Sequence, residues 1–483
     1  MNYLERKNYF KNNNSLKLSP METKGCGVII PNTFIDIHLY EELLLMVMYS
    51  PGRTTSYPSS PIEKGFRFHF LGGGNEVGNV GCILEDHTGT KLLMDYGMAP
   101  TSPPRYPREA PMVSDCILTH SHIDHIGMAP WLASNHGTLL HCTALTKMII
   151  EPMWHDCYKV SKIEGYPLAW DKRDLDEALA NRRPHPFYEE NQLGQWKWKF
   201  LPAGHIPGAA MTLIETGDKK ILFSGDFDTR DSELVSGAQP IDCDILFIEG
   251  TYAGRSHPNK DEERERFLER VLEVVERNGT CLIPAFANGR TQDILMLLHR
   301  TNPQLNVHID GMGKRLAKMY LENEEYLRDK DALISALSWA KKVGSKSDKK
   351  KALEADVIIT TSGMLNGGPS IWYLNRLRND LRNAILLTGY QAEDTGGRML
   401  LEQKRISIFG NISPIDLEVD QFSFSTHAGQ QELVDFVEGC KPKDVVIYHT
   451  DSTQSRPLLA EILQNKGYNV HCPENGETYY ILE

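Results

Sequence analysis

From Phe66 onward, hydrophobic residues occur in short runs that are separated by turn residues. The segments 66–74 and 80–97 have this pattern, and the polar residues 87–90 indicate a hairpin within the second segment. Later apolar runs each end in a polar or ionisable residue: 116-CILTH-120, 221-ILFSGD-226, 245-ILFIE-249 and 445-VVIYH-449. The pattern predicts an α+β or β-sandwich domain whose functional side chains stand where strands end in loops.

Between residues 254 and 419 the pattern changes, because apolar runs alternate with helical segments. The segment 291–300 is amphipathic with helical spacing, and it follows the apolar run 280–286. The other apolar runs of this region are 306–310, 356–363 and 384–389. Such alternation is typical of a parallel, Rossmann-like sheet. At 483 residues the chain is long enough for two domains, or for one domain with a large insertion.

Residues 1–64 differ in composition from the rest of the chain. They include the polar tract 11-KNNNS-15 and the Pro/Ser-rich segment 50–61, and they predict a poorly ordered or atypical extension. The segment 34-FIDIHLYEELLLMVM-48 is the exception, because it can dock as a helix on a partner or on a second copy of the chain. A homodimer is therefore among the assemblies that the sequence allows.

Composition restricts the class of protein. A hydrophobic fraction of 41% and a charged fraction of 24% are typical of a soluble globular protein. The apolar stretch 43–48 is far too short to span a membrane. The nine cysteines include no C-x-x-C pair, and several lie inside apolar runs, which indicates reduced thiols and a cytoplasmic location. No membrane partner is expected.

The net charge of −12 argues against a protein that binds polyanions over its whole surface. Binding of nucleic acid would have to use a local basic surface or bound metal cations. The segment 341–351 contains six lysines and is the one strong charge run. Two interpretations of it stay open, a solvated face and an electrostatic contact with nucleic acid.

The segment 119-THSHIDHIG-127 carries the strongest chemical signal of the sequence. It places four metal-ligand side chains within six positions after an apolar strand: His120, His122, Asp124 and His125. Alternation lets the first two histidines point the same way, and the following turn directs the other two residues to a neighbouring point. Imidazole and carboxylate suit zinc, and two ions about 3.5 to 4 Å apart are used to hydrolyse phosphate esters. The spacing therefore predicts a two-metal hydrolytic site.

This segment resembles the signature motif of metallo-β-lactamase-fold hydrolases, and the other motifs of that fold occur in the family's order. Asp95 in 93-LMDYG-97, His205 in 203-AGHIPGA-209 and Asp226 in 224-SGDFD-228 match them. The resemblance implies an αββα sandwich in which Asp95 orients the ligand loop. The implied zinc ligands are His120, His122 and His205 at one ion, Asp124 and His125 at the other, and Asp226 between the two.

After Asp226 the sequence is similar to the β-CASP nucleases. Glu249, His427 and His449 match motifs A, B and C of this subgroup. The segments 284–293, 362–369 and 388–398 resemble archaeal relatives of the cleavage and polyadenylation endonuclease subunit. The resemblance implies an α/β protein with an inserted Rossmann-like domain. The implied division is an extension at 1–64, a metallo-β-lactamase domain at 65–253 and 420–483, and a β-CASP domain at 254–419.

The resemblance also implies roles for residues in and around the site. His449 would complete the ligands of the second zinc, and a histidine there is typical of members that cut RNA. His427 would be the general acid for the departing 3′ oxygen, with Glu249 as its hydrogen-bond partner. The implied catalytic residues are Asp95, Asp124, Glu249 and His427.

Three further residues are candidates for binding the substrate. Ser362 and Gly363 can offer hydroxyl and backbone N–H groups to a phosphate, or they can form a tight turn. Arg290 can contact the substrate backbone, or it can pair within the protein.

The implied function is hydrolysis of RNA phosphodiester bonds by a ribonuclease with two zinc ions, as an endonuclease, a 5′-to-3′ exonuclease or both, in RNA processing or decay. The alternatives are a DNA nuclease of the same family, a small-molecule hydrolase and a non-catalytic RNA-binding subunit. A small-molecule hydrolase leaves His427 and Glu249 unexplained, and the filled ligand positions weigh against a non-catalytic subunit.

Two short segments near the predicted site concern the conformation of loops. The string 72-GGGNEVG-78 predicts a turn beside the metal site rather than a nucleotide-binding loop. The segment 450-TDSTQSRP-457 departs from the family, whose members usually have a glycine and an acidic residue there. The resemblance therefore does not define the path of this second loop.

Overall fold

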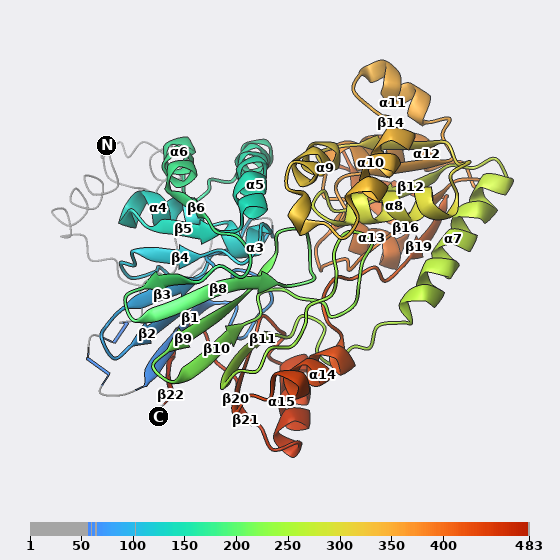
Figure 1. Cartoon of the computed structure of the whole chain (residues 1–483). Coiled ribbons are helices and arrows are strands. Elements are labelled where there is room, and N and C mark those ends of the chain that lie inside the picture. Colours follow the sequence, from blue (N-terminus) through green and yellow to red (C-terminus); the bar gives the residue numbers. More distant parts are fainter. Residues whose placement is uncertain (1–56, 59, 63–64, 102, 482–483) are drawn as a thin grey trace, which may run out of the picture. The chain divides into compact units, whose positions relative to one another are not determined.

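The computed structural model describes residues 57, 58, 60–62, 65–101 and 103–481. The segment 34–48 and nearly all of the N-terminal extension lie outside the described residues. The described chain contains two seven-stranded sheets, a six-stranded sheet and a two-stranded hairpin (Figure 1). The hairpin joins β17 (Arg405–Ile408) to β18 (Asn411–Pro414).

The first seven-stranded sheet has the order β22-β1-β2-β3-β4-β5-β6. Its strands are β1 (Phe66–Gly72), β2 (Gly81–Asp86), β3 (Lys91–Met94), β4 (Asp115–Ile117), β5 (Leu139–Cys142), β6 (Arg182–Pro184) and β22 (Thr478–Ile481). Strands β2 and β3 pair antiparallel, which confirms the hairpin expected at residues 87–90. The side chain of Asp86 accepts hydrogen bonds from the backbone N–H groups of Thr88 and Thr90, and these bonds close the turn.

The second seven-stranded sheet has the order β21-β20-β11-β10-β9-β8-β7. Its strands are β7 (Asn191–Leu193), β8 (Trp196–Pro202), β9 (Ala210–Thr216), β10 (Lys219–Phe223), β11 (Ile245–Glu249), β20 (Asp444–Tyr448) and β21 (Asn469–His471). Strand β20 pairs parallel with β11, although almost 200 residues separate them in the sequence. The apolar runs 221–223, 245–249 and 445–448 form strands, as their patterns predict, and the three strands lie in one sheet.

Aromatic side chains fill the space between the two seven-stranded sheets. Phe68 of β1 contacts Phe247 of β11 edge to face at 5.1 Å, and the ring of Phe223 lies 4.8 Å from that of Tyr448. All four side chains are fully buried. Aromatic pairs of this kind contribute about 0.5 to 1.5 kcal/mol each beyond their buried area. The alternation of apolar residues along these strands therefore produces a sandwich core.

Helices cover the outer faces of the sandwich (Figure 1). The first sheet packs against α4 (Ala129–His136), α5 (Ala144–Glu164) and α6 (Lys172–Asn181). The second sheet packs against α14 (Gln430–Cys440) and α15 (Ser455–Asn465). These layers give the αββα order of a metallo-β-lactamase domain, as expected.

The six-stranded sheet is parallel throughout, in the order β14-β13-β15-β12-β16-β19. Its strands are β12 (Cys281–Pro284), β13 (Val307–Asp310), β14 (Lys341–Lys342), β15 (Val357–Thr360), β16 (Ala384–Leu387) and β19 (Glu418–Gln421). The parallel, Rossmann-like sheet expected for the inserted domain is therefore present. Runs that are buried on both faces, such as 281-CLIP-284, are the sequence signature of such strands.

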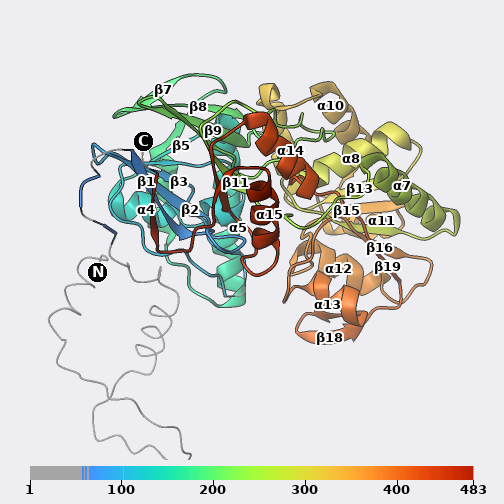
Figure 2. The ribbon, with the colours of Figure 1, turned by 90° about the horizontal axis from the view of Figure 1, so that it is seen from below.

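Two sets of helices enclose the six-stranded sheet (Figure 2). Cys281 and Ile283 belong to a core that contains α7 (Lys260–Glu276), α8 (Arg290–Thr301), α9 (Gly313–Leu321) and α10 (Lys330–Trp339). Leu282, which points to the opposite face, belongs to a core with α11 (Lys346–Ala352), α12 (Gly368–Leu377) and α13 (Gly396–Gln403). A short 3₁₀ helix, η1 (Glu324–Tyr326), follows α9.

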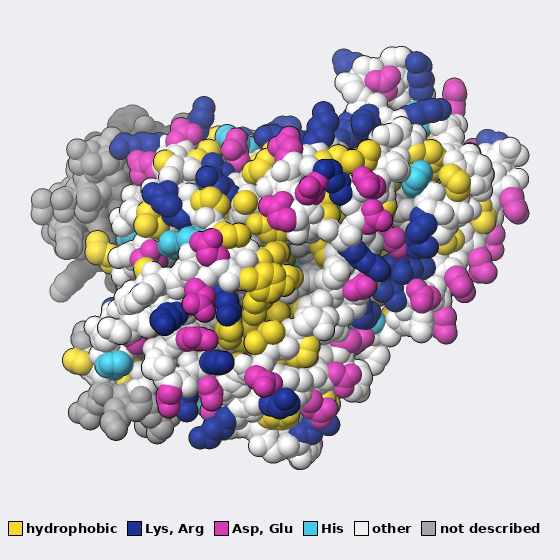
Figure 3. All heavy atoms as spheres, in the orientation of Figure 1, with side chains coloured by type: hydrophobic (Ala, Val, Ile, Leu, Met, Phe, Trp, Pro, Cys, Tyr) yellow, Lys and Arg dark blue, Asp and Glu magenta, His cyan; other side chains and the backbone are white. Residues whose placement is uncertain are grey.

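The lysine-rich segment lies on β14 and α11, at the top of the space-filling view (Figure 3). Lys342, Lys346, Lys350 and Lys351 are exposed. Lys349 instead lies 3.6 Å from the carboxylate of Asp310. The segment is thus a basic surface in which Lys349 pairs with a carboxylate and Lys341 donates a hydrogen bond to Asn306.

None of the helices within the described residues is long and apolar enough to cross a membrane. Eight of the nine cysteines fall in the described part of the chain, and all eight are free thiols.

Candidate metal centre

The loop after β4 carries the histidine motif, and hydrogen bonds to Asp95 hold it in place. His120 and His122 follow the strand, His122 with extended backbone, and the four-residue helix α3 (Ile123–Ile126) carries Asp124 and His125. The carboxylate of Asp95 accepts hydrogen bonds from the backbone N–H of Thr119 at 2.7 Å and from its hydroxyl at 2.8 Å. Its Oδ2 also lies 2.8 Å from His125 Nδ1. Asp95 thus holds the loop and orients a histidine ring.

The first group of converging side chains consists of His120, His122, His205 and Asp226, each with an atom within 4.8 Å of the others. His122 Nδ1 lies 3.1 Å from Nε2 of both other histidines. Each ligand stands on a loop that follows a strand, because His205 comes after β8 and Asp226 after β10.

The second group consists of Asp124, His125 and His449. His449 follows β20, and its Nε2 lies 3.5 Å from Asp124 Oδ2. The ring of His125 lies 5.1 Å from that of His449.

Asp226 stands between the two groups and turns one oxygen to each. Its Oδ2 lies 3.5 Å from His120 Nε2 and 3.9 Å from His205 Nε2. Its Oδ1 lies 3.3 Å from His125 Nε2 and 3.4 Å from His449 Nδ1. One carboxylate can therefore ligate two cations at once.

Three atoms of this cluster test whether the residues fit bound cations. His125 Nε2, His449 Nε2 and Asp226 Oδ1 are buried and have no hydrogen-bond partner. A buried polar atom without a partner costs about 1 to 3 kcal/mol, so such atoms rarely lie side by side without a reason. Imidazole nitrogens and carboxylate oxygens are ligands for zinc and related divalent ions. The donor set fits divalent metal ions.

Burial sets the protonation of the first group. Removal from water holds the pKa of His120 and of His205 well below the usual range, because the imidazolium form is disfavoured. Neutral imidazole is the form that binds a metal. His205 also places Nδ1 at 2.8 Å from the carbonyl of Thr426, which leaves Nε2 free to face the site.

His427 and Glu249 form a hydrogen-bonded pair beside the cluster. His427 Nδ1 lies 2.9 Å from Glu249 Oε1, and its Nε2 lies 4.0 Å from Asp226 Oδ2. Burial lowers the pKa of His427. The opposing effect of the Glu249 and Asp226 carboxylates is larger and raises this pKa to about 9. Glu249 is fully buried and accepts a second hydrogen bond, from the backbone N–H of Thr251 at 2.8 Å. The pair is rigid, and the free nitrogen of His427 faces the cluster.

The expected substrate-binding residues lie after strands of the parallel sheet and have partners there. Arg290 is 8% exposed and donates to the carbonyl of Thr388. The backbone N–H of Ser362 donates to Ser370 Oγ at 3.1 Å, and the Gly363 carbonyl accepts a hydrogen bond from Gln391. Contact of Arg290, Ser362 and Gly363 with a substrate stays a prediction.

The loops at residues 72–78 and 450–457 both have defined paths in the structure. Residues 73–78 form bends rather than a helix, and the carbonyl of Gly73 accepts a hydrogen bond from the backbone N–H of His449 at 2.6 Å. This is a turn beside the candidate metal centre. In the second loop, Asp451 Oδ1 accepts hydrogen bonds from the backbone N–H groups of Thr453 and Gln454. The segment that departs from the family pattern therefore forms a turn before α15 that the Asp451 side chain closes.

Sequence reasoning missed the threonines that orient the histidines. Thr251 Oγ1 lies 2.9 Å from His449 Nδ1, and Thr426 offers its carbonyl to His205. Each stands within two residues of Glu249 or His427, so proximity to a motif was the available signal. The partnership itself spans about 200 residues of sequence.

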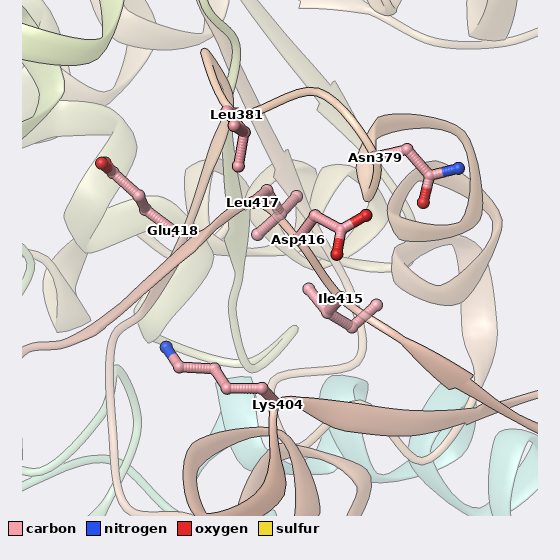
Figure 4. Close-up of a pocket in the computed structure, with 7 residues that line it drawn as sticks. All are labelled: Asn379, Leu381, Lys404, Ile415, Asp416, Leu417 and Glu418. Atoms are coloured by element: carbon pink, nitrogen blue, oxygen red, sulfur yellow. The ribbon is translucent and has the colours of Figure 1, made fainter.

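A concavity of about 580 Å³ lies elsewhere, on the inserted domain (Figure 4). Its lining includes Leu381 before β16 and Asp416 before β19, so it lies at the amino ends of these strands. Arg290 and Ser362 follow the carboxyl ends of β12 and β15. The concavity is therefore separate from the candidate metal centre.

Three family models match consecutive parts of the chain. The metallo-beta-lactamase superfamily matches residues 74–284, the Beta-Casp domain matches 291–400, and the Zn-dependent metallo-hydrolase RNA specificity domain matches 413–473. A solved structure of a protein of unknown function from Enterococcus faecalis V583 is 15% identical and shares the fold, with a TM-score of 0.56 over 86% of this chain and 100% of that one.

Curated relatives are similar over most of the chain. The probable RNase MJ4 of Methanocaldococcus jannaschii is 32% identical over 426 residues, which are 85% of this chain and 99% of the relative. RNase aCSPSF2 of Saccharolobus solfataricus is 31% identical and covers 84% of both chains. The cleavage and polyadenylation specificity factor subunit 3 of Dictyostelium discoideum is 30% identical over 84% of this chain and 56% of its own. The chain therefore belongs to the β-CASP group of the metallo-β-lactamase superfamily, a family of metal-dependent hydrolases.

Proposed function

We propose that the protein is a ribonuclease that hydrolyses RNA phosphodiester bonds with two zinc ions. The observation that carries this proposal is the position of Asp226, whose two carboxylate oxygens face two separate groups of histidines. In the proposed assignment, one ion is held by His120, His122 and His205, the other by Asp124, His125 and His449, and Asp226 is shared. When bound, two such ions neutralise phosphoryl charge and lower the pKa of water.

His427 is the proposed general acid of the reaction. Its Nδ1 is held by Glu249 at 2.9 Å, so the proton available to a substrate is on Nε2. This nitrogen faces the cluster at 4.0 Å from Asp226, where the 3′ oxygen of a bound phosphodiester would leave. Protonation of that oxygen avoids the departure of an alkoxide, which is a poor leaving group. Cations bound nearby would lower the pKa of His427 by repulsion, toward neutrality.

RNA is the proposed substrate because the relatives MJ4 and aCSPSF2 are named RNases and because a histidine, His449, occupies the motif C position. A DNA nuclease is the alternative on the same site. A thioesterase or lactonase leaves the His427–Glu249 pair without a function. A non-catalytic RNA-binding subunit leaves the unpaired ligand atoms without a function.

Matched RNA and DNA oligonucleotides of one sequence, digested by metal-free and zinc-loaded protein, test the proposal. We expect cleavage of RNA only, and only with zinc. Equal turnover of DNA would refute the RNA assignment. RNA with a 5′-triphosphate or a 5′-monophosphate then separates the two modes, because a 5′-to-3′ exonuclease responds to the 5′ end and an endonuclease does not.

Three further points belong to the proposal. The domain division remains the one at 1–64, 65–253 with 420–483, and 254–419. Free thiols support a cytoplasmic location.

A homodimer formed through residues 34–48 is proposed from the sequence alone, and deletion of residues 1–56 should change the oligomeric state without loss of turnover.

A further inference from the structure

Three side chains next to the candidate metal centre form an unusual surface cluster. The guanidinium carbon of Arg255 lies 5.9 Å from the ring centre of Tyr252 and 5.4 Å from that of Tyr390. Arg255 is exposed, and Tyr390 is 42% exposed. Among the described residues, no carboxylate lies within 4.0 Å of this guanidinium. A cation between two rings is thus open to solvent.

The cluster lies beside the proposed general acid, His427. The ring of Tyr252 lies 5.8 Å from that of His427, with an angle of 30° between their planes. Tyr252 follows Glu249 by three residues and pairs with Gly429 in a short bridge. Tyr390 comes from the inserted domain, three residues after β16. The two tyrosines therefore approach from loops that are far apart in sequence.

The backbone under the cluster is fixed although the side chains are exposed. The backbone N–H of Arg255 donates to the carbonyl of Tyr252 at 3.0 Å, and the N–H of Gln430 donates to the carbonyl of Arg255 at 2.9 Å. His257 on the same loop places Nε2 at 2.9 Å from the carbonyl of His427. A rigid loop that presents a planar cation and aromatic faces loses little conformational entropy when a flat ligand binds.

A second exposed aromatic side chain stands at the same edge of the parallel sheet. Phe286 follows β12 and is 39% exposed. A Cβ added at Gly363 or Gly389 would lie 3.4 or 3.7 Å from this ring, so the ring lies beside both glycines. Two exposed aromatic residues, Phe286 and Tyr390, thus lie near the loops that carry Ser362 and Arg290.

We propose that Arg255 and Tyr390, with Tyr252 behind them, stack on an unpaired nucleobase next to the phosphodiester that is cleaved. Aromatic rings and guanidinium planes are the groups on which single-stranded RNA bases stack. The guanidinium also supplies local positive charge in a protein whose net charge is −12. The inference rests on the proposed ribonuclease function, and it names an unpaired base beside the scissile bond as a specificity element.

The rival explanation is that the three residues only pack the loops together. The two explanations differ in what happens when the RNA base is removed. If the ring stacks on a base, removal of the base and removal of the ring lower kcat/KM by the same interaction, so that the second removal adds little to the first. If the ring only packs the loops together, removal of the ring lowers kcat/KM by the same factor on intact and on abasic RNA.

The test uses zinc-loaded full-length protein and single-stranded RNA that is cut at one mapped bond. In separate oligonucleotides, one nucleotide on either side of that bond is replaced by an abasic ribose, and kcat/KM is compared with that of intact RNA. Wild-type protein should lose roughly 5- to 150-fold at one of these positions, which is the effect of one base stack. Tyr390→Ala should lose a similar factor on intact RNA and little more on the abasic oligonucleotide, as expected for coupled groups.

Matched variants define the controls. Tyr390→Phe keeps the ring and should keep the wild-type ratio between intact and abasic RNA. Phe409→Ala removes an aromatic side chain that is 71% exposed elsewhere on the inserted domain, and it should also leave the ratio unchanged. Arg255→Ala should lower the ratio, as Tyr390→Ala does.

Two results would overturn the inference alone. One is wild-type protein that is indifferent to the base at every flanking position, and the other is Tyr390→Ala with the wild-type ratio. Failure of zinc-loaded wild-type protein to cut any RNA would instead overturn the proposed function, and the inference with it.

Discussion

The loops that follow strands of the metallo-β-lactamase domain differ from the corresponding loops of the inserted domain in how far their side chains are exposed. In the first set, Asp226 and His125 are nearly or fully buried, and each has an atom without a hydrogen-bond partner. In the second set, Phe286 and Tyr390 are about two-fifths exposed, and Ser362 is hydrogen bonded within its domain. The first set is preorganised for cations, whereas the second presents groups to a ligand that arrives from solvent.

This difference predicts where substitutions act. A change in the buried set should remove metal and chemistry together, because the proposed ligand atoms of each group converge within 4.8 Å of one another. A change in the exposed set should alter substrate binding and leave metal content intact.

The largest effect is expected for Asp226→Asn. The amide is neutral and offers only one oxygen to the two groups that the carboxylate now faces, so cation binding should weaken at both positions. We expect turnover of RNA to fall roughly 10³-fold or more, since bound cations supply several kcal/mol of transition-state stabilisation. Metal analysis should show less than the wild-type content. Asp218→Asn, on the exposed turn after β9, is the control and should change neither quantity.

His427→Ala is expected to separate chemistry from metal binding. Both ions should remain, while turnover should fall about 10² to 10⁴-fold, the usual contribution of a general acid. His141→Ala is the matched control, because His141 also pairs with a carboxylate, that of Asp115 at 2.8 Å, but outside the candidate metal centre.

A substrate with sulfur in place of the 3′ bridging oxygen identifies the role of His427. A thiolate leaves without a proton, so the deficit of His427→Ala should largely disappear on this substrate. A deficit of unchanged size, with chemistry shown to limit the rate, would mean that His427 only positions the phosphate.

Asp95→Asn should have an intermediate effect. It removes the charge that faces His125 Nδ1 at 2.8 Å, and loss of such an outer partner lowers metal affinity roughly 10- to 100-fold. Zinc titration should show one weakened site, the one that contains His125. Asp115→Asn is the control for a buried aspartate that pairs with a histidine. Equal weakening of both sites would indicate strong coupling through Asp226.

The smallest effect is expected for the double variant Lys350→Ala/Lys351→Ala. Both side chains are exposed on α11, and the solvated-face interpretation predicts that KM for RNA changes by less than about 2-fold. A clear rise in KM, with the slope of log affinity against log salt reduced by roughly 0.7 per lost phosphate contact, would instead assign this segment to RNA. The exposed set would then include α11.

Local patterns predicted much of this fold and of the site. Short apolar runs predicted the strands, and the spacing of 119-THSHIDHIG-127 predicted two neighbouring groups of ligands. The segment that carries Asp124 is a short helix, α3, where a turn was expected. Four residues are too few for a periodic signal to distinguish the two.

Long-range partnerships could not be predicted in the same way. The contact between Thr251 and His449 and the contact of Arg255 with Tyr390 join residues that are more than 130 positions apart. Both Thr251 and Tyr390 lie in or beside segments that resemble the family, but nothing in the local sequence names the residue that each of them contacts. Such pairs depend on how β11, β16 and β20 are placed in their sheets, which only the complete fold defines.

The central claim, two cations that share Asp226, is tested most directly by counting zinc per chain while turnover is measured. Metal-free wild-type protein is titrated with zinc, and RNA cleavage and bound metal are followed in the same samples. The account predicts that full activity requires two zinc ions per chain, and that Asp226→Asn binds fewer at the same free zinc concentration. Full activity with a single ion, or with no metal, would contradict it.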